Sequence, residues 1–223
     1  MIIMKTRKKM QIYNQMNKEV LSRKEKERRF KREAIMDAAV IIFAKKGYRD
    51  TTLDEIAITS EFGKGTIYNY FKSKEEIYSA IIEEVSKNLY QIIQEDDSAS
   101  KTSKDFFEMH AKLLFQYCVR KRYAFLIYVR EIAHFTTDIF ITERKKINAR
   151  HGKIKSILVK RISSGMKLKE FKKFDIEKIA ILYEHMIFPY ILFLINTFKD
   201  KFDQDKEIDF ILSVFYNGII NKK

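Results

Sequence analysis

The sequence is poor in residues that interrupt or cross-link a chain. Its 223 residues include one proline, six glycines, one cysteine and no tryptophan. So few helix-breaking residues favour long helices and an all-α fold. The single cysteine, Cys118, excludes an internal disulfide, and we interpret it as a small apolar residue of the core. A chain without disulfides fits a reducing compartment, so we expect a cytoplasmic protein.

Motifs for catalysis, metal binding and membrane insertion are also missing. The sequence has no Gly-rich phosphate loop and no nucleophile–base motif, so it does not predict an enzyme. Its four histidines have no paired spacing, so we expect neither a metal site nor another cofactor. The longest apolar run, Met186–Ile195, is far shorter than the roughly 20 residues of a membrane span. We interpret that run as a helix in the core or in a subunit interface.

Positive charge is in excess and is unevenly distributed. The net charge is +14, and residues 1–49 hold fifteen Lys or Arg against five Asp or Glu. Such a balance predicts a polyanionic partner, either nucleic acid or an anionic membrane surface. Residues 1–23 show little apolar periodicity. We interpret them as a basic arm, which either adds phosphate or minor-groove contacts or is a solvated tail.

Apolar periodicity begins near Arg32 and predicts a first helix. Gly47 is placed to end this helix in a left-handed cap. A capping-box pattern at Thr52 and Glu55 then predicts a second helix from Leu53. The inward face of the first helix consists of Ile35, Ala38, Ala39, Ile42 and Phe43.

A short third helix beginning at Lys64 carries the candidate reading surface. Residues 60–63 break the second helix, and Ile67 and Phe71 point inward because they are four residues apart. Two short helices separated by a tight turn are typical of a helix-turn-helix, although a plain three-helix bundle has the same pattern. The opposite side carries groups that suit a base edge or a phosphate, namely Lys64, Gly65, Tyr68 and Asn69.

Residues Ile35–Ile77 resemble the DNA-binding domain of the tetracycline-repressor (TetR) family. The sequence departs from the family pattern at Glu61, where a turn glycine is usual, and at Gly63, where a serine or threonine usually caps the third helix. The residues that carry the resemblance are Ala38, Ala39, Phe43, Gly47, Thr51, Thr52, Ile56, Ala57, Lys64–Tyr68, Tyr70, Phe71 and Ser73–Glu75.

The resemblance implies an architecture and a set of DNA contacts. After the basic arm of residues 1–23, it implies a helix-turn-helix DNA-binding domain over 24–72 and a helical ligand-binding and dimerisation domain over 73–223. The partners would be double-stranded DNA with a palindromic operator and a second copy of the chain, joined through its last two helices. By resemblance, Lys64, Thr66, Tyr68 and Asn69 face the groove, while Thr52, Tyr70 and Lys74 bind phosphates.

The remaining sequence predicts further helices. We expect a polar loop at Asp96–Ser100, helix caps at Asp138, Asp175 and Asp205, and a helix end at Gly165. A second capping-box pattern, at Ser73 and Glu76, predicts a long helix whose inward residues are Ile77, Ile81, Val85, Leu89 and Ile92.

Polar rings interrupt the apolar stripes of these later helices. They are either hydrogen-bonded groups of the core or orienting groups of a mostly apolar ligand cavity. The candidate ligand-binding residues are Phe106, His110, Tyr117, Tyr128, His151 and Phe188.

Together these features predict a ligand-responsive DNA-binding transcriptional regulator, a repressor released from its operator by a small hydrophobic molecule. Two alternatives remain open at this point. One is a basic helical protein acting at a membrane surface, and the other is a DNA-binding architectural factor without ligand control.

Overall fold

The computed structural model describes residues 22–133, 141–198 and 201–219. The regular structure of these residues is helical, which confirms the predicted all-α fold. The helices are α2 (Arg23–Lys46), α3 (Leu53–Ser60), α4 (Lys64–Tyr68), α5 (Lys74–Ala99), α6 (Ser103–Arg120), α7 (Arg122–Ala133), α8 (Ile141–Lys167), α9 (Ile176–Phe198) and α10 (Gln204–Ile219).

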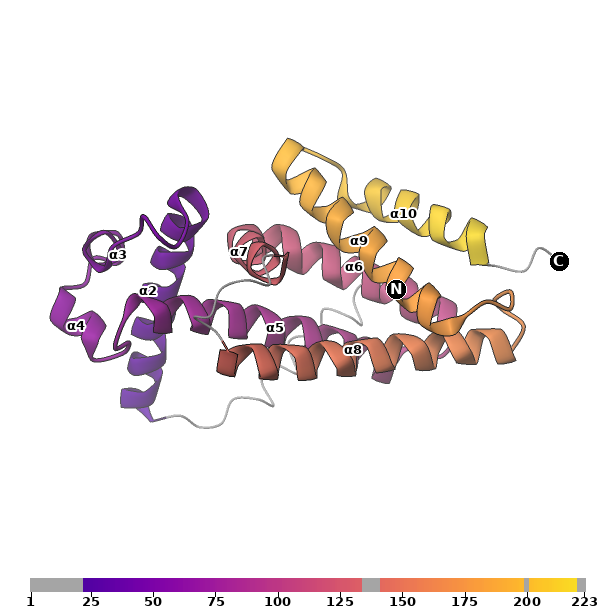
Figure 1. Ribbon diagram of the computed structural model, residues 1–223, viewed down its shortest axis with the longest axis horizontal. Helices are drawn as coiled ribbons and strands as arrows, with labels where there is room; N and C mark the ends of the chain where they lie inside the picture. The colour runs from indigo at the N-terminus through magenta and orange to yellow at the C-terminus, as the bar shows by residue number, and fades with distance from the viewer. Residues whose placement is uncertain (1–21, 134–140, 199–200, 220–223) are drawn as a thin grey trace.

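The molecule is elongated, and its N-terminal helices lie together at one end. Figure 1 shows α2, α3 and α4 at that end, while α5 leads away from them alongside α8. Helices α6, α7, α9 and α10 lie together along one side of the pair formed by α5 and α8. Contacts of α2 with both α5 and α7 join the N-terminal group to the rest of the molecule.

The boundaries of the N-terminal helices follow from local capping groups. Ser22 caps α2 with a reciprocal bond to Glu25, so this helix begins earlier than the predicted start near Arg32. Residues 1–21 of the predicted arm lie outside the described residues. Gly47 ends α2 with a positive φ of 83°, but its ψ of 172° is not that of the predicted left-handed cap. The capping box between Thr52 and Glu55 is present as predicted.

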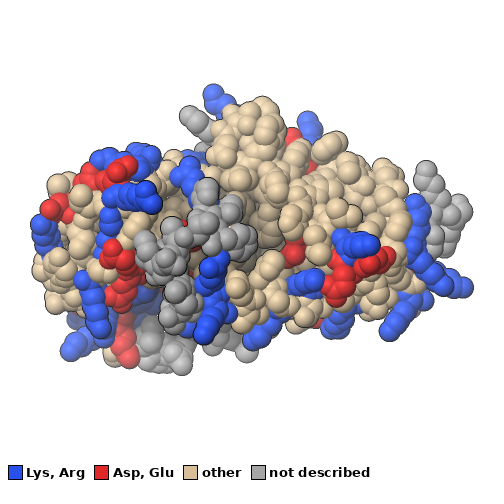
Figure 2. Space-filling view, viewed as in Figure 1, with Lys and Arg blue, Asp and Glu red and all other residues tan. Residues whose placement is uncertain are grey.

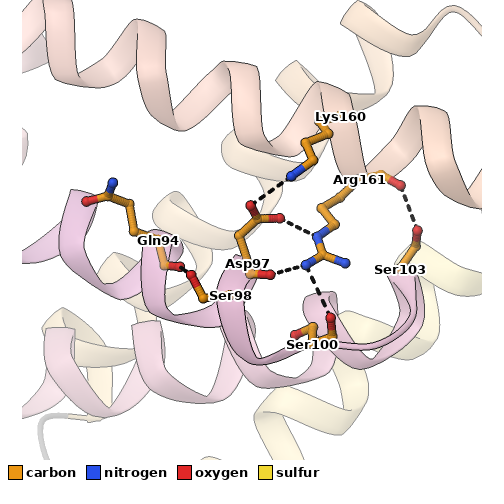
Figure 3. A network of polar contacts seen from close by, with 7 residues as sticks. All are labelled: Gln94, Asp97, Ser98, Ser100, Ser103, Lys160 and Arg161. Carbon is orange, nitrogen blue, oxygen red and sulfur yellow. Dashed lines mark hydrogen bonds and ion pairs between the residues drawn. The ribbon is translucent and has the colours of Figure 1, made fainter. Parts of the chain in front are cut away.

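The predicted polar loop at Asp96–Ser100 is wrong, because α5 continues to Ala99. Salt bridges join its last turn to α8, because the Asp97 carboxylate accepts hydrogen bonds from Arg161 and, at 3.1 Å, from Lys160 (Figure 3). The Ser103 hydroxyl donates to the Arg161 carbonyl oxygen at 2.7 Å. These tertiary partners hold polar residues in a helix that their composition does not predict.

Several other predicted boundaries change for local reasons. Ser73 caps Glu76, but the Glu76 carboxylate accepts from the Lys72 N–H at 2.6 Å, so that capping box is only half formed. The Lys206 N–H donates to Asp203, at 3.3 Å, where Asp205 was the predicted cap. The predicted cap at Asp175 is confirmed by a 3.2 Å bond from the Lys178 N–H.

The predicted cap at Asp138 lies outside the described residues. Ile93, not Ile92, is the buried isoleucine near the end of α5. All four other predicted inward residues of that helix are buried.

Gly165 lies inside α8 and does not end it. A Cβ atom at this position would overlap the ring of Phe171, so the glycine allows close packing of the chain that follows the helix. We expect Gly165→Ala to lower the free energy of unfolding by about 1–3 kcal/mol through overpacking. Gly152→Ala in the same helix is the control, because its Cβ would meet nothing within 4 Å. Urea denaturation of both variants tests this, and equal effects would contradict it.

Helix α9 is longer than the apolar run suggested. Its 23 residues are long and apolar enough, by length and composition, to cross a membrane. One side of the helix is nevertheless buried against protein, including the fully buried Tyr183 and the charged Glu184. Pro189 lies inside α9. The helix therefore has the burial of a core element that keeps a second, exposed side.

Candidate DNA-binding and effector-binding sites

A tight turn sets α4 against α3. Glu61 adopts the left-handed conformation, with φ 58° and ψ 23°, and its N–H donates to the Ile58 carbonyl at 3.2 Å. Gly63 offers no side chain to cap α4, but its carbonyl accepts from the Thr66 N–H at 2.9 Å. The two departures from the family pattern are thus accommodated in the backbone, at the cost of a strained non-glycine residue at position 61.

Helix α4 is packed against the protein on one side and exposed on the other. Ile67 and Phe71 are each 1% exposed and pack into the N-terminal core, as predicted. Tyr68 is 55% exposed on the opposite side. Of the remaining candidate contact residues, Thr52, Lys64, Gly65 and Asn69 are exposed, and Thr66 and Tyr70 are half-buried. Four of the five candidates for groove contact are therefore exposed in the structure, and Thr66 is half-buried.

Two of these candidates already have partners in the protein. Lys64 forms an ion pair with Asp54 of α3, and both side chains remain exposed. The Thr52 hydroxyl accepts from the Glu55 N–H and donates to its carboxylate, at 3.3 and 3.2 Å. The Asp54 contact could not be found from spacing, because it joins two separate helices.

Lys74 is held by the loop between α2 and α3. Its ammonium donates to the carbonyl oxygens of Tyr48, Arg49 and Thr51 at 2.9, 3.1 and 2.7 Å. It also lies 4.6 Å from the centroid of the Tyr48 ring, whose hydroxyl donates to Glu75. These contacts use the three donors of a lysine ammonium. The geometry therefore gives Lys74 a part in fixing this loop, alongside the phosphate contact implied by resemblance.

We expect Lys74→Met to lower the free energy of unfolding by about 1–3 kcal/mol, because three carbonyl groups lose a charged donor. Lys72→Met is the matched control, since Lys72 is exposed on the same segment. Thermal denaturation without DNA separates the two roles. If both variants unfold at the same temperature, Lys74 does not stabilise the loop.

The six candidate ligand residues lie in different surroundings, most of them buried and His151 exposed. His110 Nδ1 lies 3.0 Å from the Asp96 carboxylate and its ring stacks on Phe106, all within the buried core. His151 is 58% exposed in its side chain and pairs with Glu184, so its predicted place in the buried stripe of α8 is wrong. The Glu184 contact raises the pKa of His151.

The other ligand candidates are mostly buried rings. The Asn88 amide donates to the Tyr117 hydroxyl at 3.3 Å, and Phe188 stacks on Phe125 with centroids 5.9 Å apart. Burial raises the pKa of Tyr128 to about 12. Two buried atoms near His110 have no hydrogen-bond partner among the described residues, namely Asp96 Oδ1 and the Tyr183 hydroxyl. Burial also raises the pKa of Asp96, with the His110 bond opposing it.

The fold and the exposed side of α4 define a helix-turn-helix DNA-binding protein. The family model of the bacterial regulatory proteins of the tetR family matches residues 35–81. The transcriptional regulator YhgD of Bacillus subtilis is 30% identical over 179 residues, which cover 79% of this chain and 89% of YhgD. The chain therefore belongs to the TetR family of bacterial transcriptional regulators.

Two further comparisons cover most of the chain. The fatty acid metabolism regulator protein of Bacillus subtilis is 26% identical over 201 residues, covering 88% of this chain and all of that protein. The structure of FadR from the same organism in complex with stearoyl-CoA matches with a TM-score of 0.69 at 22% identity, over 83% of this chain and 98% of FadR. The predicted family and the predicted class of DNA-binding transcriptional regulator are confirmed.

Proposed function

We propose that the protein is a cytoplasmic repressor that binds a palindromic operator as a homodimer and leaves it when a hydrophobic effector binds. The observation that carries the DNA-binding part is the anchoring of α4 by Ile67 and Phe71, which leaves its other side open. In this proposal Lys64, Gly65, Thr66, Tyr68 and Asn69 enter the major groove, while Thr52, Tyr70 and Lys74 lie along the phosphates.

The dimer would form through the exposed sides of α9 and α10. Large apolar side chains stay exposed there, including Leu182 at 60%, Phe193 at 53%, Phe210 at 56% and Val214 at 50%. Figure 2 shows that the surface over these helices carries few charged side chains. Exposed apolar patches of this kind mark interaction sites, and a second copy presents the same patch about a two-fold axis.

The effector would bind inside the body formed by α5 to α9. Phe106, His110, Tyr117, Tyr128 and Phe188 supply an aromatic interior with few polar groups, which suits a long apolar chain with one polar end. His151 would lie at the exposed edge of this region. The names of two relatives, a fatty acid metabolism regulator and a FadR that binds stearoyl-CoA, favour a long-chain acyl thioester as the effector class.

Release from DNA would be a shift between two populations. Operator DNA favours one spacing of the two N-terminal domains, and effector favours another, so each binding event weakens the other by the same coupling free energy. An effector that binds the DNA-incompetent state 100-fold more tightly shifts the equilibrium by about 2.7 kcal/mol.

Adding stearoyl-CoA should raise the unfolding temperature of the protein and displace it from a selected operator duplex. At 100 times its dissociation constant, a bound effector adds about 2.7 kcal/mol to stability. Thermal-shift measurements and fluorescence anisotropy of labelled DNA test both effects, with free CoA as the control. Stabilisation by a ligand that leaves DNA affinity unchanged would contradict release. If the protein binds its operator but binds no acyl thioester of any chain length, it is a DNA-binding architectural factor without ligand control.

A further inference from the structure

Two carboxylates in the first turn of α3 each pair with a lysine of a neighbouring helix. Glu55 pairs with Lys46, the last residue of α2. Asp54 pairs with Lys64, the first residue of α4. Glu55 also forms the capping box with Thr52, so it has a part in starting α3. Asp54 is not a member of that box, and the ammonium that it holds belongs to a residue proposed to enter the major groove.

The pair between Asp54 and Lys64 joins the two helices of the helix-turn-helix. The Lys64 side chain is 56% exposed and that of Asp54 is 58% exposed. Water and salt reach both groups, so an ion pair of this kind contributes little to stability. Because it lies at the start of α4, beside the proposed DNA-contacting side, the pair is placed where it can change the way Lys64 meets DNA.

A lysine can contact either a phosphate or a base edge. Its ammonium is a point charge on a flexible stem, and phosphates attract it all along a duplex. Those contacts carry no information about sequence, whereas a contact with guanine O6 or N7 depends on the base. A carboxylate beside the ammonium offsets its charge and repels phosphates. An uncharged base acceptor is not repelled in this way, and the ammonium keeps donors for it because it has three.

We propose that Asp54 is a specificity-determining residue that acts through Lys64. By holding the Lys64 ammonium, the Asp54 carboxylate lowers the affinity for DNA in general more than the affinity for an operator whose base acceptors lie within reach of the lysine. Asp54 itself needs no contact with a base, so it is a positioning residue. The inference rests on the proposed DNA contact of Lys64.

Fluorescence anisotropy of the full-length protein on two duplexes of equal length tests the proposal. One duplex carries the selected operator and the other carries a scrambled sequence. Asp54→Asn should tighten binding to the scrambled duplex about two- to fivefold, the range of an exposed ion pair, and should tighten operator binding less. The ratio of operator affinity to scrambled affinity therefore falls. Asp54→Glu keeps the charge and should keep most of that ratio.

Two further variants separate this role from a simple loss of negative charge. In a Lys64→Met background, Asp54→Asn should leave the ratio of affinities unchanged, because the coupling needs both partners. Asp50→Asn removes an exposed carboxylate from the loop before α3 and should tighten binding to both duplexes alike. Each variant should unfold at the wild-type temperature, because the replaced side chains are exposed.

Three results would overturn the proposal. The first is an unchanged ratio of affinities for Asp54→Asn. The second is a fall in the ratio that persists in the Lys64→Met background, which would mean that Asp54 repels DNA directly. Both of these results leave the DNA contact of Lys64 intact. In the third, Lys64→Met binds the operator as tightly as wild type, and the proposed DNA contact of Lys64 then fails as well.

Discussion

Operator affinity should fall about 10³- to 10⁵-fold when salt rises from about 50 to about 200 mM, if the dimer makes six to ten phosphate contacts. The expectation follows from the net charge of +14 and its concentration in the first quarter of the sequence. Each neutralised phosphate releases counterions and adds about 0.9 to the slope of log affinity against log salt. Fluorescence anisotropy across a salt series measures that slope.

Substitution of Arg23 and Lys24 tests whether the positive charge at the start of α2 contributes to DNA binding. Both are exposed in the first turn of α2. Replacing both with glutamine should lower the salt slope and weaken all DNA sequences alike, because phosphate contacts carry no base information. Lys206→Gln serves as the control, since it lies in α10 and is exposed. A slope that is flat in wild type would contradict DNA binding by this basic surface.

Replacing two adjacent residues of α4 with alanine should affect two different properties, the stability of the protein and its affinity for DNA. Ile67→Ala should lower the free energy of unfolding by about 2–5 kcal/mol, because Ile67 is 1% exposed and leaves a cavity. Tyr68→Ala should leave stability nearly unchanged and cost about 1–3 kcal/mol of operator binding per half-site. Ile58, which is 78% exposed, gives a matched control for the loss of an isoleucine.

Urea denaturation and operator titration of the same three variants separate a loss of core packing from a loss of DNA contacts. The account predicts that only Ile67→Ala loses stability and that Tyr68→Ala loses affinity for the operator. If Tyr68→Ala binds normally, the exposed side of α4 is not the reading surface. If Ile58→Ala destabilises as much as Ile67→Ala, the orientation of the helices is wrong.

The N-terminal helices were predictable from sequence because their signals are local. Capping residues such as Thr52 act on neighbours three positions away, and the spacing of Ile67 and Phe71 already orients α4. The later elements depend on distant partners. His110 of α6 bonds to Asp96 near the end of α5, and the Phe171 ring packs against Gly165 inside α8. Spacing along the chain does not contain such contacts.

Some features of the candidate site also follow from local sequence, and others depend on distant contacts. Exposure of Lys64, Tyr68 and Asn69 follows from helical periodicity and needs no tertiary information. The engagement of Lys74 by three loop carbonyls depends on how α5 meets the loop after α2, which periodicity does not describe. His151 is not part of the buried stripe of α8, because its side chain is 58% exposed and pairs with Glu184.

Selection of bound duplexes from a random DNA pool tests the central claim most directly. The wild-type protein should enrich an inverted repeat, since a two-fold dimer places two α4 helices on two half-sites. Tyr68→Ala, carried through the same selection, should enrich that repeat weakly or with altered bases. Recovery of unrelated duplexes by the wild-type protein, with no shared repeat, would contradict sequence-specific reading by α4.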